Sequence, residues 1–223
     1  MPMKKEHVVN LMLQTRVIPL FYEADIVVAR QLIDACYAGG ARVIEFTNRG
    51  NHAPVVFDAL INYSKQHYPE LALGVGSIAN EKQAALFIEM GAHFLVSPFL
   101  DEGVSETCRA HDILWSGGCG TLTEMQRAHL MGMPIIKAFP GNVLGPAFVK
   151  AAQAPCPWFN IMPTGGVKPE EENLKAWFEA GAKCVGMGSR LFVKDDEGHF
   201  QYSKITELLQ FSIQLAQDLN TSA

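Results

Sequence analysis

The chain has 223 residues, which is enough for one sizeable hydrophobic core but short for two ordinary domains. Its 18 basic and 23 acidic residues give a formal net charge of -5, and no basic cluster overrides that balance, which argues against nucleic-acid binding. No apolar run approaches the length of a membrane span, which argues against a membrane protein. The five cysteines form no C-x-x-C pair, so we expect reduced cysteines in the cytoplasm and no zinc knuckle.

The chain begins with a predicted helix and continues with short apolar runs. The N-terminal segment MPMKKEHVVNLML lacks the apolar core and cleavage site of a signal peptide, so we expect an extra helix before the first strand. The apolar residues of the later runs are continuous rather than alternating, which is typical of strands buried on both faces of a parallel sheet. The eight predicted strands are Val17–Phe21, Val43–Thr47, Leu71–Val75, His93–Val96, Ile113–Trp115, Pro134–Ala138, Trp158–Met162 and Cys184–Met187.

Amphipathic segments separate these runs, and several carry signals of a helix end. The predicted helices include Asp25–Tyr37, a segment from Asn80 to Met90, a segment opened by a capping box at Thr121 and Glu124, and Ile205–Leu219. Glycine supplies the left-handed residue that ends many helices. It follows four helical runs directly before a strand, at Gly39-Gly40, Gly91, Gly132 and Gly181.

The repeated order of strand, helix and glycine predicts the fold. Eight such units make a (β/α)8 TIM barrel, and no linker divides the chain, so we expect a single α/β domain over residues 1–223. The alternative is an open doubly wound parallel sheet. No G-x-G-x-x-G motif follows the first strand to favour that alternative.

Lys137 is the most unusual residue of the predicted barrel, because it places a charge inside the apolar run Pro134–Ala138. Burial lowers the pKa of a lysine and leaves a neutral amine that can attack a ketone. Taken alone, Lys137 is better explained as an ion-paired lysine, or as one whose amine reaches solvent from a strand end. The residues around it reverse that preference.

Three polar residues near the ends of the second and third strands complete a candidate site. If Glu45, within Val43–Thr47, points into the barrel, it can hold the amine and move protons; a structural ion pair with Lys137 or Arg49 is the alternative. Arg49 can bind a carboxylate in bidentate fashion, although exposed loop arginines are common. Ser77 can contact the same carboxylate or cap the next helix. A 2-keto acid has a carboxylate beside its ketone, which suits a lysine and an arginine together.

Glycine-rich turns follow the seventh and eighth predicted strands. Gly165 and Gly166 come after Thr164, and Gly188 and Ser189 come after the eighth strand. Backbone N–H groups in such turns form the usual phosphate site of a barrel, and two tight turns without a ligand are the alternative. Thr164 can hydrogen-bond the substrate. The seven histidines show no metal-ligand spacing, so we expect no metal site.

The order of these residues resembles the 2-keto-3-deoxy-6-phosphogluconate (KDPG) aldolases, a family also known as the 4-hydroxy-2-oxoglutarate (KHG) aldolases. The resemblance implies an eight-stranded barrel, a homotrimer, and no metal or organic cofactor. It runs from about Val17 to Phe192. The motifs that carry it are Glu45 with Arg49, Gly76-Ser77, Ser97-Pro98, Lys137 before Phe139-Pro140, Pro163-Thr164-Gly165-Gly166, and Gly188-Ser189.

The resemblance also implies a role for each site residue. Lys137 would form the Schiff base with the substrate, and Glu45 would act as general acid and base. Arg49 and Ser77 would bind the substrate carboxylate. Thr164 would contact the pyruvate part and control stereochemistry. The phosphate would be held by Gly165, Gly166, Gly188 and Ser189.

Several positions around the pocket depart from the family pattern. They bear on which sugar acid is cleaved rather than on the type of reaction. Gly50 replaces a usual threonine after Arg49, and Phe99 replaces a usual glycine. The segments Ser116-Gly117-Gly118-Cys119-Gly120 and Ala138-Phe139-Pro140-Gly141-Asn142 also differ from the usual Pro-Gly-rich loop and Phe-Phe-Pro motif.

We therefore expect a class I, metal-independent aldolase. It would reversibly cleave KDPG, a related 2-keto-3-deoxy sugar acid or KHG to pyruvate and an aldehyde, either glyceraldehyde 3-phosphate or glyoxylate. The expected partner is this small 2-keto acid, phosphorylated at its far end. Two alternatives remain open: a phosphosugar isomerase or synthase on the same barrel that forms no Schiff base, and a non-catalytic barrel that binds sugar acids.

Overall fold

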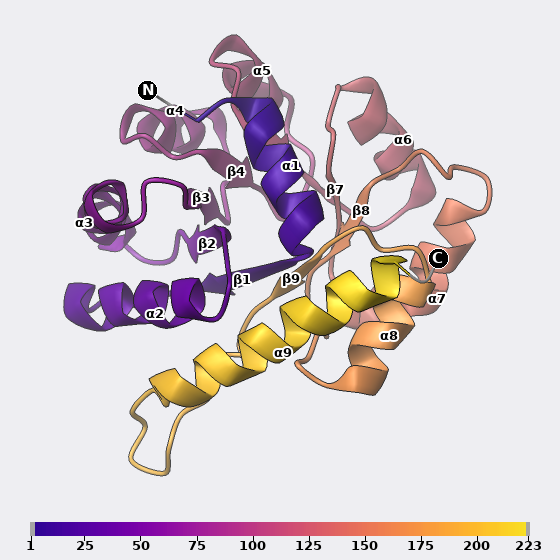
Figure 1. Cartoon of the computed structure of the whole chain (residues 1–223). Coiled ribbons are helices and arrows are strands. Elements are labelled where there is room, and N and C mark those ends of the chain that lie inside the picture. The colour runs from indigo at the N-terminus through magenta and orange to yellow at the C-terminus, as the bar shows by residue number, and fades with distance from the viewer. Residues whose placement is uncertain (1–2, 222–223) are drawn as a thin grey trace.

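The computed structural model describes residues 3–221, in which strands alternate with helices (Figure 1). The strands are β1 (Val17–Phe21), β2 (Val43–Thr47), β3 (Ala72–Gly76), β4 (Phe94–Val96), β5 (Leu114–Ser116), β6 (Gly118–Cys119), β7 (Ile136–Ala138), β8 (Ile161–Pro163) and β9 (Val185–Met187). The helices are α1 (Lys5–Thr15), α2 (Ile26–Ala38), α3 (Ala53–His67), α4 (Glu81–Glu89), α5 (Glu102–Ala110), α6 (Leu122–Leu130), α7 (Gly141–Gln153), α8 (Glu171–Glu179) and α9 (Tyr202–Thr221).

The parallel strands form one ring. Hydrogen-bonded neighbours follow the order β5-β4-β3-β2-β1-β9 in one sheet and β6-β7-β8 in another. Two links join these sheets, because β5 continues into β6 across Gly117 and Thr164, just after β8, forms a parallel bridge to Gly186 in β9. The curled sheet is therefore a TIM-like barrel, and the open doubly wound alternative is wrong.

Helix α1 lies at the end of the barrel where the strands begin. Each strand of the barrel, or the residue just before it, contributes at least one residue to a cluster with Val8 and Met12 of α1. These residues face inward, and Figure 1 shows α1 lying across the ring, with α2–α5 on one side and α6–α8 on the other. The barrel residues of this cluster are Ile18, Val43, Ala72, Phe94, Val96, Leu114, Ile135, Met162 and Cys184.

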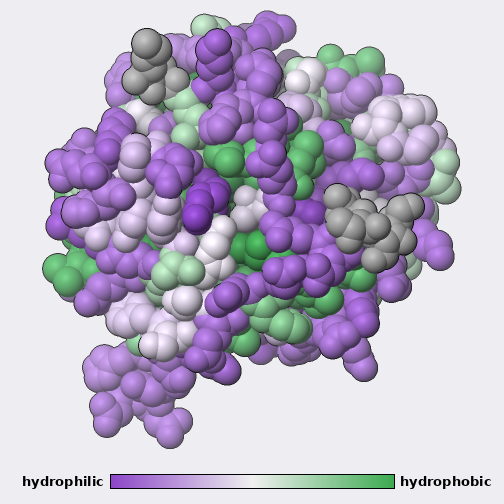
Figure 2. Space-filling model, viewed as in Figure 1, coloured by the Kyte–Doolittle hydropathy of each residue, from purple (hydrophilic) through white to green (hydrophobic). Residues whose placement is uncertain are grey.

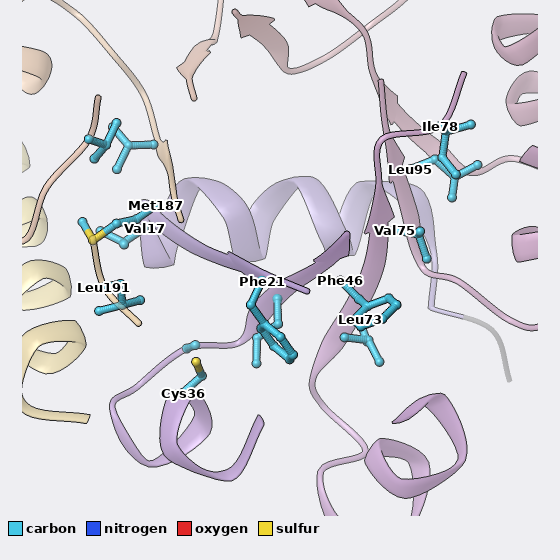
Figure 3. Close-up of a cluster of buried hydrophobic side chains, with 14 of the residues drawn as sticks. Val17, Phe21, Cys36, Phe46, Leu73, Val75, Ile78, Leu95, Met187 and Leu191 are labelled. Carbon is cyan, nitrogen blue, oxygen red and sulfur yellow. The ribbon is translucent and has the colours of Figure 1, made fainter. Parts of the chain in front are cut away.

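The larger core lies between the outer face of the barrel and the surrounding helices. Outward residues of four neighbouring strands, among them Val17, Phe46, Val75 and Met187, belong to one buried cluster (Figure 3). Helix residues such as Cys36 in α2 pack into the same cluster. Strands that are covered inside and outside have no polar face, which explains their continuous apolar runs.

The predicted helix signals lie where the helices begin and end. The carboxylate of Asp25 accepts hydrogen bonds from the N–H groups of Val27 and Val28, and the Asn80 side chain accepts one from Gln83 N–H. The predicted capping box of α6 is present. Four glycines that precede strands have positive φ angles, which favours glycine over residues with a Cβ: Gly40, Gly91, Gly132 and Gly181.

Some predicted boundaries are wrong. The predicted strand Trp158–Met162 begins only at Ile161, because the chain still turns at Phe159, whose N–H donates to the Cys156 carbonyl. The predicted strand Ile113–Trp115 starts one residue later and is followed by β6, so one strand of the barrel is interrupted at Gly117. Ser77 is not the cap of the next helix, since Asn80 holds that position.

The surface seen in Figure 2 is mainly hydrophilic, with hydrophobic residues visible in the furrows between elements. No helix among residues 3–221 is long and apolar enough to cross a membrane. All five cysteines are free, and four of them are buried.

Candidate active site

Lys137 and Glu45 lie inside the barrel. Each follows an inward-facing apolar residue by two positions: Ile135, just before β7, precedes Lys137, and Val43 in β2 precedes Glu45. Since side chains alternate along a strand, both point into the interior. Only 5% of Lys137 and 4% of Glu45 is exposed to solvent. The structure thus brings together the two charged residues that the sequence predicts as reactive.

The two side chains influence each other's protonation. Burial raises the pKa of the Glu45 carboxyl above its ordinary value, and the positive charge of Lys137 opposes this rise. Burial lowers the pKa of Lys137, and the negative charge of Glu45 opposes that fall. A lysine with a lowered pKa has more neutral amine at a given pH, which is the form that attacks a carbonyl.

Gly76 leaves space for the Glu45 carboxylate, and the Phe139 ring packs against the Lys137 amine. A Cβ atom at Gly76 of β3 would lie 1.7 Å from Oε1 of Glu45, so the carboxylate occupies the space that any larger residue would need. At β7, the Nζ atom of Lys137 lies 4.6 Å from the centroid of the Phe139 ring. A neutral amine loses little in such apolar contact, and an ammonium is still attracted by the ring face.

A cavity of about 760 Å³ opens at the ends of β1, β2, β8 and β9. These are carboxyl ends of parallel strands, where barrel enzymes hold their substrates. Thr47 lies two residues after Glu45 on the same strand face, and Phe139 contacts Lys137; both line the cavity. The buried pair therefore lies next to the inner end of the cavity.

Six of the predicted binding residues line this cavity, and Ser77 does not. The exposed Arg49 follows β2 at one side. The other side is formed by the two glycine-rich turns. Ser77 is exposed and has a φ angle of 62°, but it is not part of the cavity wall. The predicted residues in the wall are Arg49, Thr164, Gly165, Gly166, Gly188 and Ser189.

The hydroxyl of Thr164 is buried and has no partner. Thr164 is 6% exposed, and its Oγ1 atom makes no hydrogen bond. A Cβ atom at Gly186 would lie 2.5 Å from this oxygen, so glycine at 186 leaves the hydroxyl its space. Because Thr164 also lines the cavity, its Oγ1 atom can bond a ligand there.

The turn after β8 is built around close backbone contacts with α7. Gly165 and Gly166 have φ angles of 96° and 75°, which glycine adopts without strain. A Cβ atom at Gly166 would lie 2.9 Å from Cα of Asn142, and one at Gly141 would lie 2.4 Å from the Gly165 carbonyl oxygen. The departure from the family pattern at Gly141-Asn142 is thus part of how this turn packs.

The structure also shows the surroundings of three other departures from the family pattern, at Ser116, Gly50 and Phe99. Ser116 is fully buried, and its hydroxyl donates a hydrogen bond to the Ile135 carbonyl at 2.9 Å, which links the neighbouring β5 and β7 regions. Gly50 has a φ angle of 72°, a conformation that the usual threonine would adopt only with strain. Phe99 is 47% exposed and is not part of the cavity wall.

Sequence reasoning missed part of the cavity wall. Phe139 and Asn142 lie in a segment expected around the pocket, Lys168 comes two residues after Gly166, and Arg190 follows Ser189 directly, so their positions were a usable signal. Lys194 and Phe200 had no such signal, since they come from an irregular connection after β9. The wall residues to which sequence reasoning assigned no binding role include Thr47, Phe139, Asn142, Lys168, Arg190, Lys194 and Phe200. Among residues 3–221, no group of three or more His, Cys, Asp or Glu side chains is arranged to hold a metal ion.

Comparisons with known proteins find one family of aldolases along most of the chain. A model of the family described as KDPG and KHG aldolase matches residues 8–208. The chain is 31% identical over 205 residues to the KHG/KDPG aldolase of Escherichia coli K12, covering 90% of this chain and 92% of that protein. It is 29% identical over 201 residues to the 2-dehydro-3-deoxy-phosphogluconate aldolase of Pseudoalteromonas atlantica, covering 90% and 91%.

A solved structure agrees with these relatives. The KDPG aldolase from Legionella pneumophila, with pyruvate captured as a covalent carbinolamine intermediate, has a TM-score of 0.80 to this chain and 26% identity. The match covers 91% of this chain and 96% of that one. The likeness therefore includes nearly the whole barrel.

Proposed function

Since the chain belongs to the KDPG and KHG aldolase family, whose model matches residues 8–208, we propose that it reversibly cleaves a 2-keto-3-deoxy sugar acid, phosphorylated at its far end, or KHG. It is a class I aldolase, and its products are pyruvate and an aldehyde, glyceraldehyde 3-phosphate or glyoxylate. The observation that carries the assignment of residues is the buried Lys137, coupled to Glu45, next to a cavity lined by cations and glycine-rich turns.

Lys137 is the nucleophile of this proposal. Its neutral amine attacks the C2 ketone and forms a carbinolamine, which loses water to give an iminium ion. Removal of the proton from the C4 hydroxyl breaks the C3–C4 bond, and the bonding electrons move into the iminium as an enamine. Protonation of the enamine at C3 and hydrolysis of the iminium release pyruvate and restore the amine. The carbinolamine captured in the Legionella enzyme supports this route.

Glu45 is the proton carrier. Its raised pKa brings the carboxyl closer to neutral pH, where it can both accept and return a proton. Its carboxylate would take the proton of the C4 hydroxyl, directly or through a water molecule, and later deliver a proton to C3. The confinement of the carboxylate against Gly76 supports this role, because proton transfer requires a held geometry.

The remaining predicted residues bind the substrate. Arg49 would hold the carboxylate beside the ketone, and Thr164 would donate its unpartnered hydroxyl to the bound pyruvate part. Ser77 remains a proposed carboxylate contact from the end of the neighbouring strand β3. The far phosphate would be held by the backbone of Gly165, Gly166 and Gly188 and by the Ser189 hydroxyl.

Trapping with pyruvate tests this assignment. Wild-type protein treated with pyruvate and borohydride should gain a reduced pyruvate adduct on the peptide that contains Lys137. Lys137→Met should abolish both the adduct and turnover, whereas Lys150→Met, which changes an exposed lysine of α7, should keep both. An adduct that persists in Lys137→Met would show that another lysine is the nucleophile.

The same experiment separates the alternatives. A phosphosugar isomerase or synthase would form no pyruvate adduct, and a non-catalytic barrel would bind sugar acids without releasing pyruvate. A panel of phosphorylated and unphosphorylated keto acids with coupled detection of pyruvate would then identify the sugar acid.

We also propose a homotrimer located in the cytoplasm, built from one domain over residues 1–223, with α1 as an addition that closes the barrel. Free cysteines support the location. Three exposed apolar side chains after β4, β6 and β7 offer a contact surface: Phe99, Leu122 and Val143. Sedimentation velocity would reveal the trimer, and a monomer at micromolar concentration would contradict it.

A further inference from the structure

The connection between β9 and α9 forms part of the cavity wall. After Gly188 and Ser189, the chain contributes Arg190, then continues into a short hairpin in which Lys194 and Phe200 pair by an antiparallel bridge. Arg190, Lys194 and Phe200 all line the cavity. The hairpin therefore supplies side chains to the same end of the cavity as the glycine-rich turn after β9.

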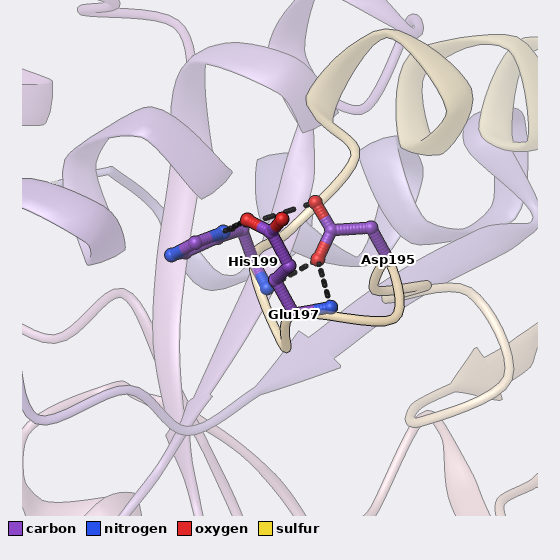
Figure 4. Close-up of polar contacts among 3 residues, drawn as sticks. All are labelled: Asp195, Glu197 and His199. Carbon is purple, nitrogen blue, oxygen red and sulfur yellow. Dashed lines mark hydrogen bonds and ion pairs between the residues drawn. The ribbon is translucent and has the colours of Figure 1, made fainter.

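The hairpin is held by its own hydrogen bonds. The Asp195 carboxylate accepts hydrogen bonds from the N–H groups of Glu197 and His199, at 3.0 and 2.9 Å (Figure 4). The Asp195 N–H donates to the His199 carbonyl, and the Gln201 N–H donates to the Val193 carbonyl. The acidic residues occupy the tip, which is exposed and does not line the cavity. The hairpin thus presents its cation to the cavity and its acids to solvent.

The cavity wall has a charge opposite to that of the whole chain. The chain has a net charge of -5, yet the wall contains four cationic residues and no aspartate or glutamate. Arg49 lies at the β2 side. The other three cations, Lys168, Arg190 and Lys194, follow the two glycine-rich turns after β8 and β9. One cation therefore lies at the end of the cavity proposed for the substrate carboxylate, and three cations lie at the far end.

The three far cations differ in how free they are to bind a ligand. Lys168 forms an ion pair with Glu170 at 3.6 Å, so part of its charge is compensated. The Nζ atom of Lys194 lies 4.2 Å from the centroid of the Phe200 ring, which orients the ammonium without neutralising it. Among the described residues, the Arg190 side chain forms no ion pair. Arg190 and Lys194 are therefore the two far cations whose charge no ion pair among the described residues compensates.

We propose that Arg190 and Lys194 are specificity-determining residues that select substrates whose aldehyde part ends in a phosphate dianion. The proposal rests on the proposed aldolase function and names the group at the far end of its substrate. Backbone N–H groups of the glycine turns give direction to the phosphate oxygens, and the two side chains offset its charge of nearly two units. A terminal carboxylate has half that charge, and a terminal hydroxymethyl group has none, so both would bind less well.

The test compares substrates within each variant. Wild type, Arg190→Gln, Lys194→Gln and the double variant would be assayed with a 6-phosphorylated 2-keto-3-deoxy sugar acid, with its unphosphorylated counterpart and with KHG. Lys82→Gln, an exposed lysine of α4 outside the cavity, is the matched control. We expect kcat/KM for the phosphorylated acid to fall roughly tenfold in each single variant, mainly through KM, because each loses one charge-assisted contact.

The other substrates and the salt dependence distinguish charge recognition from damage to the fold. The kcat/KM for the unphosphorylated acid should stay within about twofold of wild type in every variant. Added salt should lower the kcat/KM for the phosphorylated acid less in the double variant than in wild type. Phe200→Leu should lower the kcat/KM for the phosphorylated acid less than Lys194→Gln does, because it removes the ring contact of the Lys194 ammonium but keeps its charge. Equal losses for all substrates, or no loss for the phosphorylated one, would overturn the proposal.

Failure of the aldolase function itself would be recognised separately. Pyruvate trapping on Lys137 involves no far phosphate, so every variant of Arg190 and Lys194 should form the adduct at the wild-type level. Absence of the adduct in wild type would remove the proposed function. Its presence, together with an unchanged preference for the phosphorylated acid in the double variant, would remove only the role of Arg190 and Lys194.

Discussion

Glu45 and Lys137 oppose each other's response to burial, and this coupling predicts a pH effect. Glu45 raises the pKa of Lys137. Glu45→Gln removes that negative charge, so the pKa of Lys137 should fall further below its ordinary value. The neutral amine is the reactive form, and the rate of pyruvate trapping rises as pH rises through the lysine pKa. The midpoint of that rise should therefore move to lower pH in Glu45→Gln.

Single-turnover trapping at several pH values measures this midpoint. Glu124→Gln, which changes a carboxylate of the α6 capping box, should leave it unchanged. Overall turnover of Glu45→Gln should still fall strongly, since the variant lacks its proton carrier. A midpoint that moves to higher pH would mean that Glu45 does not act on Lys137 through its charge.

Thr164 predicts a change in which stability and activity move in opposite directions. Its buried Oγ1 atom has no hydrogen-bond partner, which costs the folded protein free energy. Thr164→Val keeps the shape and removes that hydroxyl, so the free energy of unfolding should stay the same or rise by about 1 kcal/mol. The kcat/KM for cleavage should fall, because a contact to the bound substrate is lost. Urea unfolding and a pyruvate-release assay would check both, and a loss of stability would indicate an unseen partner for the hydroxyl.

At the scale of elements, strand β3 leaves space for the carboxylate of its neighbour β2. Gly76→Ala would place a Cβ atom 1.7 Å from Oε1 of Glu45, so the carboxylate must move. Misplacement of a proton carrier by about an ångström costs roughly 100-fold in rate, and we expect kcat to fall by about that factor. Pyruvate binding at Arg49 should change less.

A second glycine provides the control for this substitution. Gly103 lies in α5, where an added Cβ would meet side chains rather than backbone: Oε2 of Glu81 at 2.9 Å, Cβ of Glu81 at 3.3 Å and Oδ1 of Asp101 at 3.4 Å. Gly103→Ala should leave kcat unchanged and should not destabilise the helix, since alanine favours helix over glycine by about 1 kcal/mol. If Gly76→Ala retained the kcat of Gly103→Ala, Glu45 would not need its present position.

The elements differ in how far the sequence could predict them. Charged residues inside apolar runs, such as Lys137 and Glu45, are visible in the sequence because burial of a charge is costly and therefore rare. The hairpin with Lys194 and Phe200 shows no strand or helix pattern, and its place in the cavity wall depends on how the chain returns after β9. The sequence also could not predict that Ser77 lies outside the cavity wall, because its residue type does not determine its positive φ angle.

At the scale of the whole molecule, one buried guanidinium joins the two ends of the chain. Arg16, between α1 and β1, is 6% exposed and donates hydrogen bonds to the carbonyls of Ala182, Lys183 and Ala216. Its guanidinium also lies 4.3 Å from the centroid of the Phe178 ring. Burial lowers the pKa of Arg16. The residue thus connects β1, α8, the start of β9 and the last helix α9 at the end of the barrel opposite the cavity.

This position predicts a loss of stability without a direct loss of catalysis. Arg16→Met would leave three carbonyl groups without their donor, so the free energy of unfolding should fall by about 3 kcal/mol. Arg16→Lys should recover only a small part, because one ammonium cannot replace the planar guanidinium fork. Below the unfolding transition, kcat/KM should stay near wild type, since strand starts and strand ends lie at opposite ends of the barrel. Urea midpoints would measure the effect against Arg109→Met, an exposed arginine of α5. Equal midpoints for Arg16→Met and Arg109→Met would show that α9 is held by its apolar face alone.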